Sequence, residues 1–526
     1  MTKRISPRDV RHAWRSGAEL ALLDVREEGP YALAHPFFAV SLPVSEIEAR
    51  IQSLVPRLGA PIAVYDDGEG FAERAVQRIE RLGYTAVALL DGGLAAYRQA
   101  GEVFRDVNVP SKAFGELVEA IRHTPSLNAR EAKALIESNP NVAVADARRF
   151  EEYRTMSIPK GINVPGGELA LRIFDIAPSP DTFVLVNCAG RTRSIIGAQT
   201  LIDAGIPNKV AALRNGTIGW TLEGLPLEKG QTRRFPEVSA AGRARARAAA
   251  AKWSARVGVR TLEKEEYGRW LLERDGRTLY LFDVRTPEEY AAGHPEGFQS
   301  APGGQLVQAT EEWAAVRGAR LVLFDDDGVR ARMTAYWLVQ MGWEAVALAE
   351  GVLTASETKT PAPRRAPLWD AGSAFIDAKE LAALETGFAV ADLARSPVYR
   401  AGHIPRAWFV SAVRLADDMA ELPGSGPIVL TSPDGHLALD NFHEARAGTA
   451  REIRVLRGGT SAWTASGLPL ENSPVHWASE PQDVYKRPYE GTNNAREAMQ
   501  AYIDWELQLV AQLANDSVSN FHVVRR

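Results

Sequence analysis

Cysteine is almost absent from this chain of 526 residues, because Cys188 is the only one. A single cysteine cannot form a disulfide or a thiolate zinc site within one chain, so we expect a reducing, cytoplasmic setting. The nine histidines show no spacing typical of metal ligands. No metal site is therefore expected.

Long apolar runs and a strong net charge are also lacking. No apolar run approaches the ~18 residues that cross a bilayer, and the opening MTKRISPRDV lacks the apolar segment of a secretory signal. The 61 Lys and Arg residues nearly balance the 66 Asp and Glu residues, which leaves a net charge of −5. This balance gives no general attraction to nucleic acid or to an anionic membrane, so neither is an expected partner.

An apolar stretch that contains an aspartate near its end occurs four times along the chain. The stretches LALLDVR, VAVADAR, LYLFDVR and FAVADLAR place these aspartates at Asp24, Asp146, Asp283 and Asp392. After each one come a second apolar stretch, a helical pattern and a third apolar stretch that ends in glycine. Short strands that alternate with helices predict an α/β fold of four tandem domains, each a small, mainly parallel sheet flanked by helices.

These repeats set the expected domain boundaries. Four domains are expected at 1–105, 124–230, 258–355 and 373–473, and a C-terminal helical tail at 474–526. Apolar residues of the tail recur at intervals of three and four, at Met499, Ile503, Leu507 and Val510. This spacing predicts an amphipathic helix that packs on the repeats or, in the alternative, pairs with a second copy of the chain.

Two connecting segments differ from the repeats in composition. Residues 231–257 are rich in alanine and arginine. They predict a solvated helix that bridges two halves of the chain, with a nucleic-acid or partner contact as the alternative. Residues 356–368 form a Pro-rich linker.

Cys188 opens the loop CAGRTRS, between an apolar stretch and an amphipathic helix. In parallel sheets such loops lie at the carboxyl ends of the strands, where ligands bind. A lone cysteine is most often an inert, buried side chain. Here, however, Gly190 permits a tight turn, Arg191 and Arg193 add positive charge, and loop amides at a helix start favour an anion. These features predict a Cys188 pKa lowered toward neutrality, and hence a nucleophilic thiolate.

Several motifs in a fixed order make the chain resemble the rhodanese family. In the second repeat these are DAR at 146–148, EEY at 151–153, the CAGRTRS loop and a Gly-x-x-x-Trp…GLPLE close. The segments TPEEYAAGHPEG and GHIPRA match a second family signature in the third and fourth repeats. The resemblance covers all four repeats but not the connectors or the tail.

The resemblance implies sulfur transfer. Cys188 would attack the outer sulfur of a small anionic donor such as thiosulfate, become a persulfide, and pass the sulfur to cyanide or a thiol, including a protein thiol. Covalent catalysis of this kind needs no metal or organic cofactor. The implied substrate-binding residues are those after Cys188 in the loop: Ala189, Gly190, Arg191, Thr192, Arg193 and Ser194.

The second repeat also departs from the family pattern. Met156 and Ser157 replace the expected Gly-His. Arg149 and Arg154 lie near this point in the sequence and are candidate donor contacts, with solvation at the surface as the alternative.

The other three repeats lack the nucleophile. Asp66 and Asp326 are expected at the loop position in the first and third repeats, and Ser432 or Pro433 in the fourth. With this alignment, Ala331 would stand where Arg193 stands. A carboxylate cannot form a persulfide and repels an anionic donor. These repeats are therefore expected to be inactive copies with a structural or partner-binding role.

Two other classes of function remain open at this point. A Cdc25-like phosphatase needs an arginine six positions after its cysteine, but the sixth position here is Ser194 and Arg193 comes one residue early. Arsenate reduction would also need a second cysteine. A non-catalytic persulfide carrier or scaffold for sulfur metabolism is the closer alternative, because it differs from the enzyme mainly in its donor.

Overall fold

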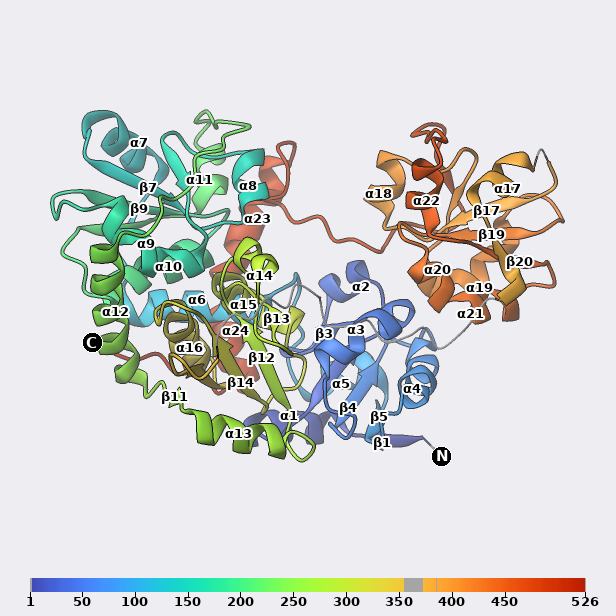
Figure 1. The fold of residues 1–526 in the computed structure, drawn as a ribbon, viewed down its shortest axis with the longest axis horizontal. Coiled ribbons are helices and arrows are strands. Elements are labelled where there is room, and N and C mark those ends of the chain that lie inside the picture. Colours follow the sequence, from blue (N-terminus) through green and yellow to red (C-terminus); the bar gives the residue numbers. More distant parts are fainter. Residues whose placement is uncertain (1, 354–371, 385, 526) are drawn as a thin grey trace. The chain divides into compact units, whose positions relative to one another are not determined.

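Residues 2–353, 372–384 and 386–525 are described by the computed structural model (Figure 1). The Pro-rich linker expected at 356–368 lies outside the described residues. The chain divides into two compact units. The first comprises residues 1–7, 21–107 and 364–485, and the second comprises residues 8–20, 108–363 and 486–526. The first and fourth sheets belong to the first unit, and the second and third sheets belong to the second.

The first sheet has the strand order β1-β5-β4-β2-β3, and its neighbouring strands are parallel. Its strands are β1 (Lys3–Ile5), β2 (Ala21–Asp24), β3 (Val40–Ser41), β4 (Ile62–Tyr65) and β5 (Val87–Leu90). Its helices are α2 (Glu28–Leu33), α3 (Ile47–Leu54), α4 (Phe71–Arg81) and α5 (Gly93–Ala100). The central strands β2 and β4 are buried along their whole length, as their continuous apolar runs predict.

The fourth sheet repeats this order as β16-β20-β19-β17-β18 and adds β21 at its edge. Its strands are β16 (Phe375–Ile376), β17 (Ala389–Asp392), β18 (Trp408–Phe409), β19 (Ile428–Thr431), β20 (Ile453–Leu456) and β21 (His476–Trp477). Its helices are α17 (Ala378–Ala383), α18 (Ser396–Ala401), α19 (Leu415–Asp418), α20 (His436–Asp440), α21 (Phe442–Ala447) and α22 (Gly459–Ala465).

The second sheet has the order β6-β10-β9-β7-β8. Its strands are β6 (Ser126–Leu127), β7 (Val142–Asp146), β8 (Gly161–Asn163), β9 (Phe183–Asn187) and β10 (Val210–Leu213). Its helices are α7 (Ala129–Ser138), α8 (Phe150–Thr155), α9 (Leu169–Ile176), α10 (Thr192–Asp203) and α11 (Gly216–Leu222). Strand β9, which precedes the cysteine loop, is therefore central.

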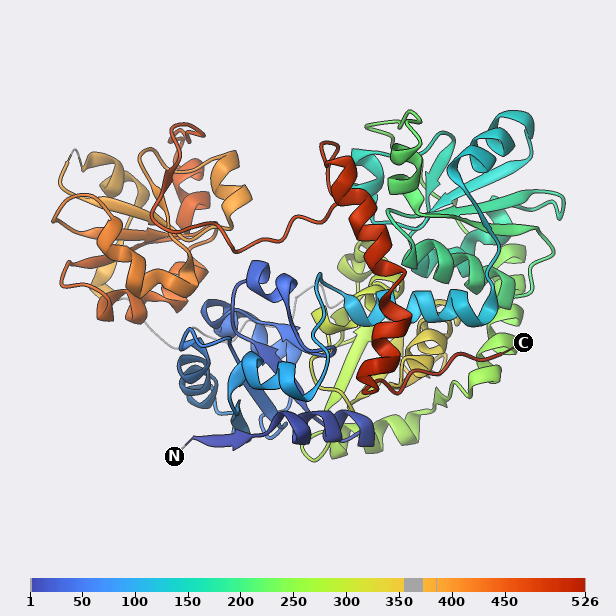
Figure 2. The ribbon, with the colours of Figure 1, turned by 180° about the vertical axis from the view of Figure 1, so that it is seen from behind.

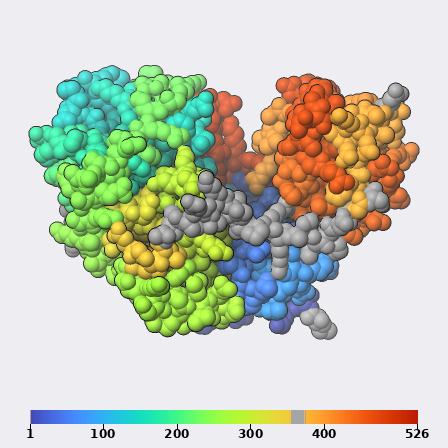
Figure 3. Space-filling model, viewed as in Figure 1, coloured from blue at the N-terminus to red at the C-terminus, as the bar shows by residue number. Residues whose placement is uncertain are grey.

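The third sheet follows the same rule, in the order β11-β15-β14-β12-β13. Its strands are β11 (Thr261–Leu262), β12 (Leu279–Asp283), β13 (Gln299–Ser300), β14 (Arg320–Phe324) and β15 (Glu344–Leu348). Its helices are α13 (Lys264–Glu273), α14 (Pro287–Ala292), α15 (Gly303–Gln308) and α16 (Arg330–Gln340). The second and third repeats pack against each other within their unit (Figure 3).

Helix α1 (Pro7–Ser16) follows β1 of the first repeat, but most of it belongs to the second compact unit. Within the described part of the chain, four α-helices lie outside the four repeats: α6 (Val109–Arg122), α12 (Ala240–Ser254), α23 (Arg496–Glu506) and α24 (Leu509–Asp516). Figure 2 shows the tail helices α23 and α24, in red, running across α6. Among the described residues, no helix is both long enough and apolar enough to cross a membrane.

The repeated aspartates end the central strands β2, β7, β12 and β17 and are fully or almost fully buried. In the first three repeats an arginine two residues later pairs with the carboxylate, as Arg148 does with Asp146 at 2.7 Å. The fourth repeat has Ala394 at this position. Because no arginine balances the charge there, burial raises the pKa of Asp392 to about 6.

The Ala/Arg segment forms α12, but not as a fully solvated helix. It packs on α9 of the second repeat and α16 of the third, and it buries Ala246, Ala250 and Trp253. Arg247 donates through Nε to the carbonyl oxygen of Asp327 at 2.7 Å. The expectation of solvation is wrong for this face, because alanine side chains are small enough to let neighbouring helices approach closely.

The tail helix breaks where an unbroken apolar stripe was expected. Met499 and Ile503 are buried, but α23 ends at Glu506 and leaves Leu507 53% exposed. After the break, Leu509 and Leu513 of α24 face the protein instead. The change of register therefore lets both short helices pack within the second unit.

Candidate active site

Cys188 begins the loop between β9 and α10. The start of α11, which follows β10, holds the backbone of this loop. There the Thr217 N–H donates to the Cys188 carbonyl oxygen at 2.9 Å. Gly216 has φ of +52° and approaches so closely that a Cβ there would lie 2.3 Å from the Cys188 carbonyl oxygen. Only glycine fits this contact, which explains the glycine that ends the third apolar stretch.

Burial dominates the ionisation of the Cys188 thiol. The residue is 1% exposed, and desolvation raises its pKa above the ordinary value. The charge of Arg193 and hydrogen bonding from Ser194 lower the pKa, but by less. The expectation of a pKa lowered toward neutrality is therefore wrong in direction, because the loop keeps water away from the sulfur.

Arg191 does not act on the thiol as expected. Its guanidinium is buried against α6, where Nε lies 2.6 Å from Glu116 Oε1 and Nη2 contacts Glu119. Nη1 donates to Asn215 Oδ1 at 3.0 Å. Arg191 therefore fastens the cysteine loop to α6 and to the start of α11.

Arg193 is the loop arginine whose charge acts on Cys188. Its side chain is 9% exposed and forms a two-bond pair with Glu152 of α8, at 2.7 and 2.8 Å. Arg193 and its neighbours hold the pKa of Glu152 far below its usual range. The pair thus stays charged while the guanidinium lies beside the thiol.

The other loop residues are also mostly withdrawn from solvent. The Ala189 carbonyl accepts from the Ile218 N–H at 3.0 Å. Thr192 starts α10, and its Oγ1 is buried without a hydrogen-bond partner among the described residues. Gly190 faces the tail helix α23, where a Cβ would lie 3.3 Å from Tyr502 Cε1 and 3.4 Å from Glu506 Oε2.

A cavity of about 220 Å³ lies beside Arg193. The second repeat, the third repeat and the tail all contribute to its lining, with Arg149, Glu152, Arg193, Gln305, Trp313 and Tyr489 among the residues. Arg149 therefore faces this cavity, whereas Arg154 is exposed on α8 and is not part of the lining. Motif spacing did not indicate the walls from the third repeat and the tail, because both are remote from Cys188 in sequence.

The loops of the other repeats show which residues replace Cys188. Each begins directly after its strand, with Asp66 after β4, Asp325 after β14 and Ser432 after β19. In each, the side chain accepts a hydrogen bond from the backbone N–H six residues later, at 2.9, 2.9 and 3.3 Å. The backbone N–H of Ser194 bonds to Cys188 in the same way.

This shared hydrogen bond corrects the alignment of the third repeat. Asp325, not Asp326, is the counterpart of Cys188, and Arg330, not Ala331, is the counterpart of Arg193. The sequence run of three aspartates hid the one-residue shift. In the fourth repeat, Ser432 holds the position and Pro433 does not.

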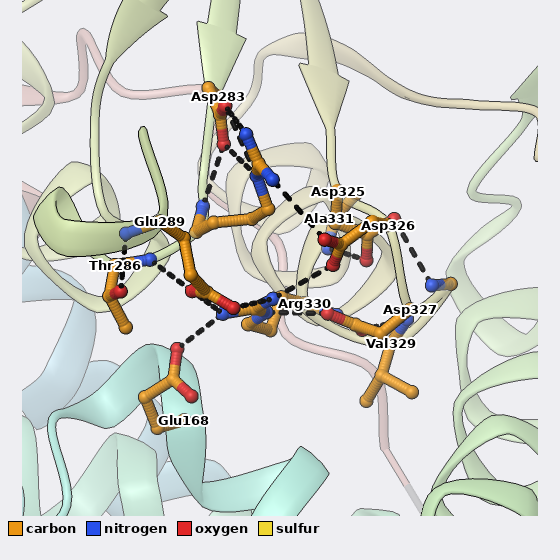
Figure 4. Close-up of polar contacts among 12 residues, drawn as sticks. Glu168, Asp283, Thr286, Glu289, Asp325, Asp326, Asp327, Val329, Arg330 and Ala331 are labelled. Carbon is orange, nitrogen blue, oxygen red and sulfur yellow. Dashed lines mark hydrogen bonds and ion pairs between the residues drawn. The ribbon is translucent and has the colours of Figure 1, made fainter. Parts of the chain in front are cut away.

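Arg330 forms several ion pairs at the loop of the third repeat (Figure 4). It contacts Asp327 and Glu289 of its own repeat and Glu168 of the second repeat, at 2.5, 2.5 and 2.9 Å. Burial and the Asp327 charge raise the pKa of Asp325 to about 8. In the third repeat, the loop therefore has an acidic residue, Asp325, at the position that the Cys188 thiol occupies in the second repeat.

Across the part of the chain that the structure describes, His, Cys, Asp and Glu form no group of three or more that is arranged to hold a metal ion.

The family model described as Rhodanese-like domain matches four segments, at residues 7–100, 128–223, 268–356 and 377–466. The chain belongs to the rhodanese family. This membership and the α/β fold of four rhodanese-like repeats confirm the resemblance and the fold class inferred from the motifs.

Individual relatives agree with this membership. A solved structure of thiosulfate sulfurtransferase from Pseudomonas aeruginosa is 52% identical, with a TM-score of 0.94, and covers 99% of this rhodanese chain and 100% of that one. The HTH-type transcriptional regulator Rv0324 of Mycobacterium tuberculosis is 26% identical over 42% of this chain and 89% of that protein. The putative sulfur carrier protein YrkF of Bacillus subtilis is 26% identical over 18% of this chain and 51% of that protein.

Proposed function

We propose that this rhodanese is a sulfurtransferase that carries sulfane sulfur on Cys188. The observation that carries the proposal is the position of the chain's only thiol, at the carboxyl end of a central strand, beside the Arg193 charge. A relative that is 52% identical over nearly the whole chain and is named a thiosulfate sulfurtransferase supports thiosulfate as the donor.

The reaction has two halves. In the first, the Cys188 thiolate attacks the outer sulfur of thiosulfate, the donor's S–S bond breaks, and sulfite leaves with the bonding electrons. In the second, cyanide or a thiolate attacks the terminal sulfur of the persulfide and regenerates Cys188. The terminal sulfur is anionic, so the Ser194 N–H and the Arg193 guanidinium are suited to stabilise it.

The cavity beside Arg193 is the proposed route for the donor. Its lining holds three arginines and three glutamates, so its formal charges balance, and Arg149 and Arg193 are arginines of the second repeat that an anionic donor could contact there. Gln305 and Trp313 belong to the third repeat, so that repeat serves the reaction as a wall of the site rather than as a second centre.

The alternatives are less well supported. A phosphatase loop would place an arginine where Ser194 bonds to the thiol, and arsenate reduction would require a second cysteine. The carrier alternative is not favoured, because the relative that spans the whole chain is a named sulfurtransferase. The single reduced thiol is consistent with a cytoplasmic setting.

Thiocyanate formation from thiosulfate and cyanide by the purified full chain tests the proposal. Turnover that is lost in Cys188→Ser supports it. An intact protein that forms neither thiocyanate nor a Cys188 persulfide with thiosulfate would overturn it.

A further inference from the structure

The C-terminal helix α23 brings a carboxyl group onto the cysteine loop. Glu506, the last residue of α23, is 1% exposed. Its Oε1 accepts the Tyr502 hydroxyl at 2.8 Å, and its Oε2 is buried with no hydrogen-bond partner among the described residues. A Cβ on Gly190 would lie only 3.4 Å from Oε2. The unpartnered oxygen therefore faces the loop that Cys188 begins.

Aromatic packing holds this helix in place. The Lys112 ammonium of α6 lies over the rings of Tyr489, Tyr502 and Trp505, at 5.8, 5.1 and 5.4 Å from their centroids. The rings of Tyr489 and Tyr502 also meet edge to face at 5.3 Å. Cation–π contacts to a buried lysine fix the backbone that carries Glu506.

Charged and titratable groups face Glu506 from three directions. Lys112 and Glu116 lie on α6, Tyr502 on α23 itself, and Arg191 on the cysteine loop. Arg191 is largely neutralised by its own pairs with α6. Burial raises the pKa of Glu506 to about 7, and Glu506 in turn raises the pKa of the Cys188 thiol. Ionisation of both buried groups, the Cys188 thiol and the Glu506 carboxyl, at the same time is therefore unfavourable.

We propose that Glu506 takes up a proton as the Cys188 thiol loses one when sulfur is loaded. This inference rests on the proposed function. The two groups share no hydrogen bond and are coupled through their charges. The S–H bond of Cys188 breaks and its proton is lost to the medium, an O–H bond forms on Glu506 with a proton from the medium, and the thiolate attacks the outer sulfur of thiosulfate, which releases sulfite. The loaded site then holds a persulfide anion beside a neutral carboxylic acid. The total charge is unchanged, because the thiol, carboxylate and thiosulfate become a persulfide anion, a carboxylic acid and sulfite.

The second half of the reaction reverses the proton movement. When an acceptor removes the terminal sulfur, Cys188 leaves as a thiolate and is protonated again, and Glu506 loses its proton. The tail thus gives the second repeat a group for proton storage that lies outside the matched rhodanese segments.

A proton inventory during loading tests this directly. Wild-type protein and Glu506→Gln are mixed with thiosulfate at about pH 8 in weakly buffered solution with an indicator dye, and persulfide is counted by mass spectrometry. Wild type should release almost no proton per persulfide, whereas Glu506→Gln should release about one. Asp504→Asn is the matched control, because Asp504 is exposed on the same helix, and it should behave as wild type. Equal proton release by wild type and Glu506→Gln would overturn the proposal.

Alkylation of Cys188 by iodoacetamide separates this proposal from sulfur transfer itself. Without any sulfur donor, the wild-type rate should rise with pH and then level off above about pH 7, where Glu506 becomes ionised and opposes the thiolate. In Glu506→Gln the rate should continue to rise about tenfold per pH unit up to the ionisation of the thiol. If the alkylation rate of Glu506→Gln also levels off above about pH 7, the proposal is contradicted even if sulfur transfer is confirmed.

Tyr502→Phe provides a second variant in case Glu506→Gln does not fold. The Tyr502 hydroxyl stabilises ionised Glu506, so its loss should move the levelling point of alkylation to higher pH. If the alkylation rate of a folded Tyr502→Phe protein levels off at the same pH as in wild type, a group other than Glu506 causes the levelling, and the proposal is wrong.

Discussion

Asp325 holds in the third repeat the position that Cys188 holds in the second. Both follow the central strand directly, and both are bonded by the backbone N–H that lies six residues later in the first turn of the next helix. The arginine near the end of the loop also recurs, since Arg193 pairs with Glu152 and Arg330 with Glu289. The two loops thus share their scaffold and differ in the side chain that directly follows the strand.

We expect full loading with thiosulfate to add one transferable sulfur per chain. Asp66, Asp325 and Ser432 occupy the other three loop positions, and none of them can form a persulfide. Intact-protein mass spectrometry should show one added sulfur in wild type and none in Cys188→Ser. The serine variant should keep its circular dichroism spectrum, because a hydroxyl differs little in size from a thiol. A second sulfur that cyanide can remove would contradict this prediction.

Arg193→Ala should lower kcat/KM for thiosulfate by roughly tenfold to a hundredfold, the range expected for loss of a charged hydrogen bond. Its charge acts on the thiol and its side chain lines the cavity, so a sulfur donor that carries no negative charge should be affected less. Steady-state kinetics with both donors provide the measurement. Arg130→Ala is a suitable control, because Arg130 is 79% exposed. An equal loss with both donors would indicate that Arg193 only supports the loop.

Arg191→Ala should reduce stability rather than donor selectivity. Its removal leaves Glu116 without its cation inside the protein, and breaking a buried pair typically costs about 3–5 kcal/mol. Hydrogen exchange should become faster in α6 and in the cysteine loop. Unchanged exchange together with a selective loss of thiosulfate use would assign Arg191 to the donor instead.

Asp325→Cys should not create a second active loop. Asp327 stands where the active loop has Gly190, and its buried carboxylate lies beside Arg330. A fixed negative charge at this point opposes an anionic donor. Loading of Asp325→Cys with thiosulfate should therefore still give one sulfur per chain, counted by mass spectrometry. Two sulfurs would show that the thiol alone is sufficient.

Asp392→Asn should stabilise the fourth repeat at neutral pH. The pKa of Asp392 is raised to about 6 in the folded protein, so folding binds a proton between about pH 4 and 6. Stability is therefore greatest below this window, falls as pH rises through it, and stays lower above it. Asparagine removes this loss, which amounts to roughly 2–3 kcal/mol at most.

Hydrogen exchange of β17 and β19 at two pH values measures this effect locally, which suits a chain that divides into two compact units. Exchange in Asp392→Asn should be slower than in wild type at pH 7 and similar at about pH 4. Slower exchange at both values would point to a change in packing rather than in ionisation.

The sequence alone determined the repeated α/β architecture and the one residue that can carry sulfur. Both depend on local chemistry, because strand and helix periodicity repeats within short segments and Cys188 is the only thiol. The aspartates at the ends of β2, β7, β12 and β17 could be located in the same way.

The tertiary structure decided what surrounds that thiol. Burial raises its pKa, Arg191 turns away to α6, and Gln305 and Glu506 come from the third repeat and the tail. No local pattern encodes these contacts, because they join segments that are remote in the sequence and depend on how helices pack. Desolvation and the direction of a side chain are properties of the packed site, so only the folded chain fixes the electrostatics of Cys188.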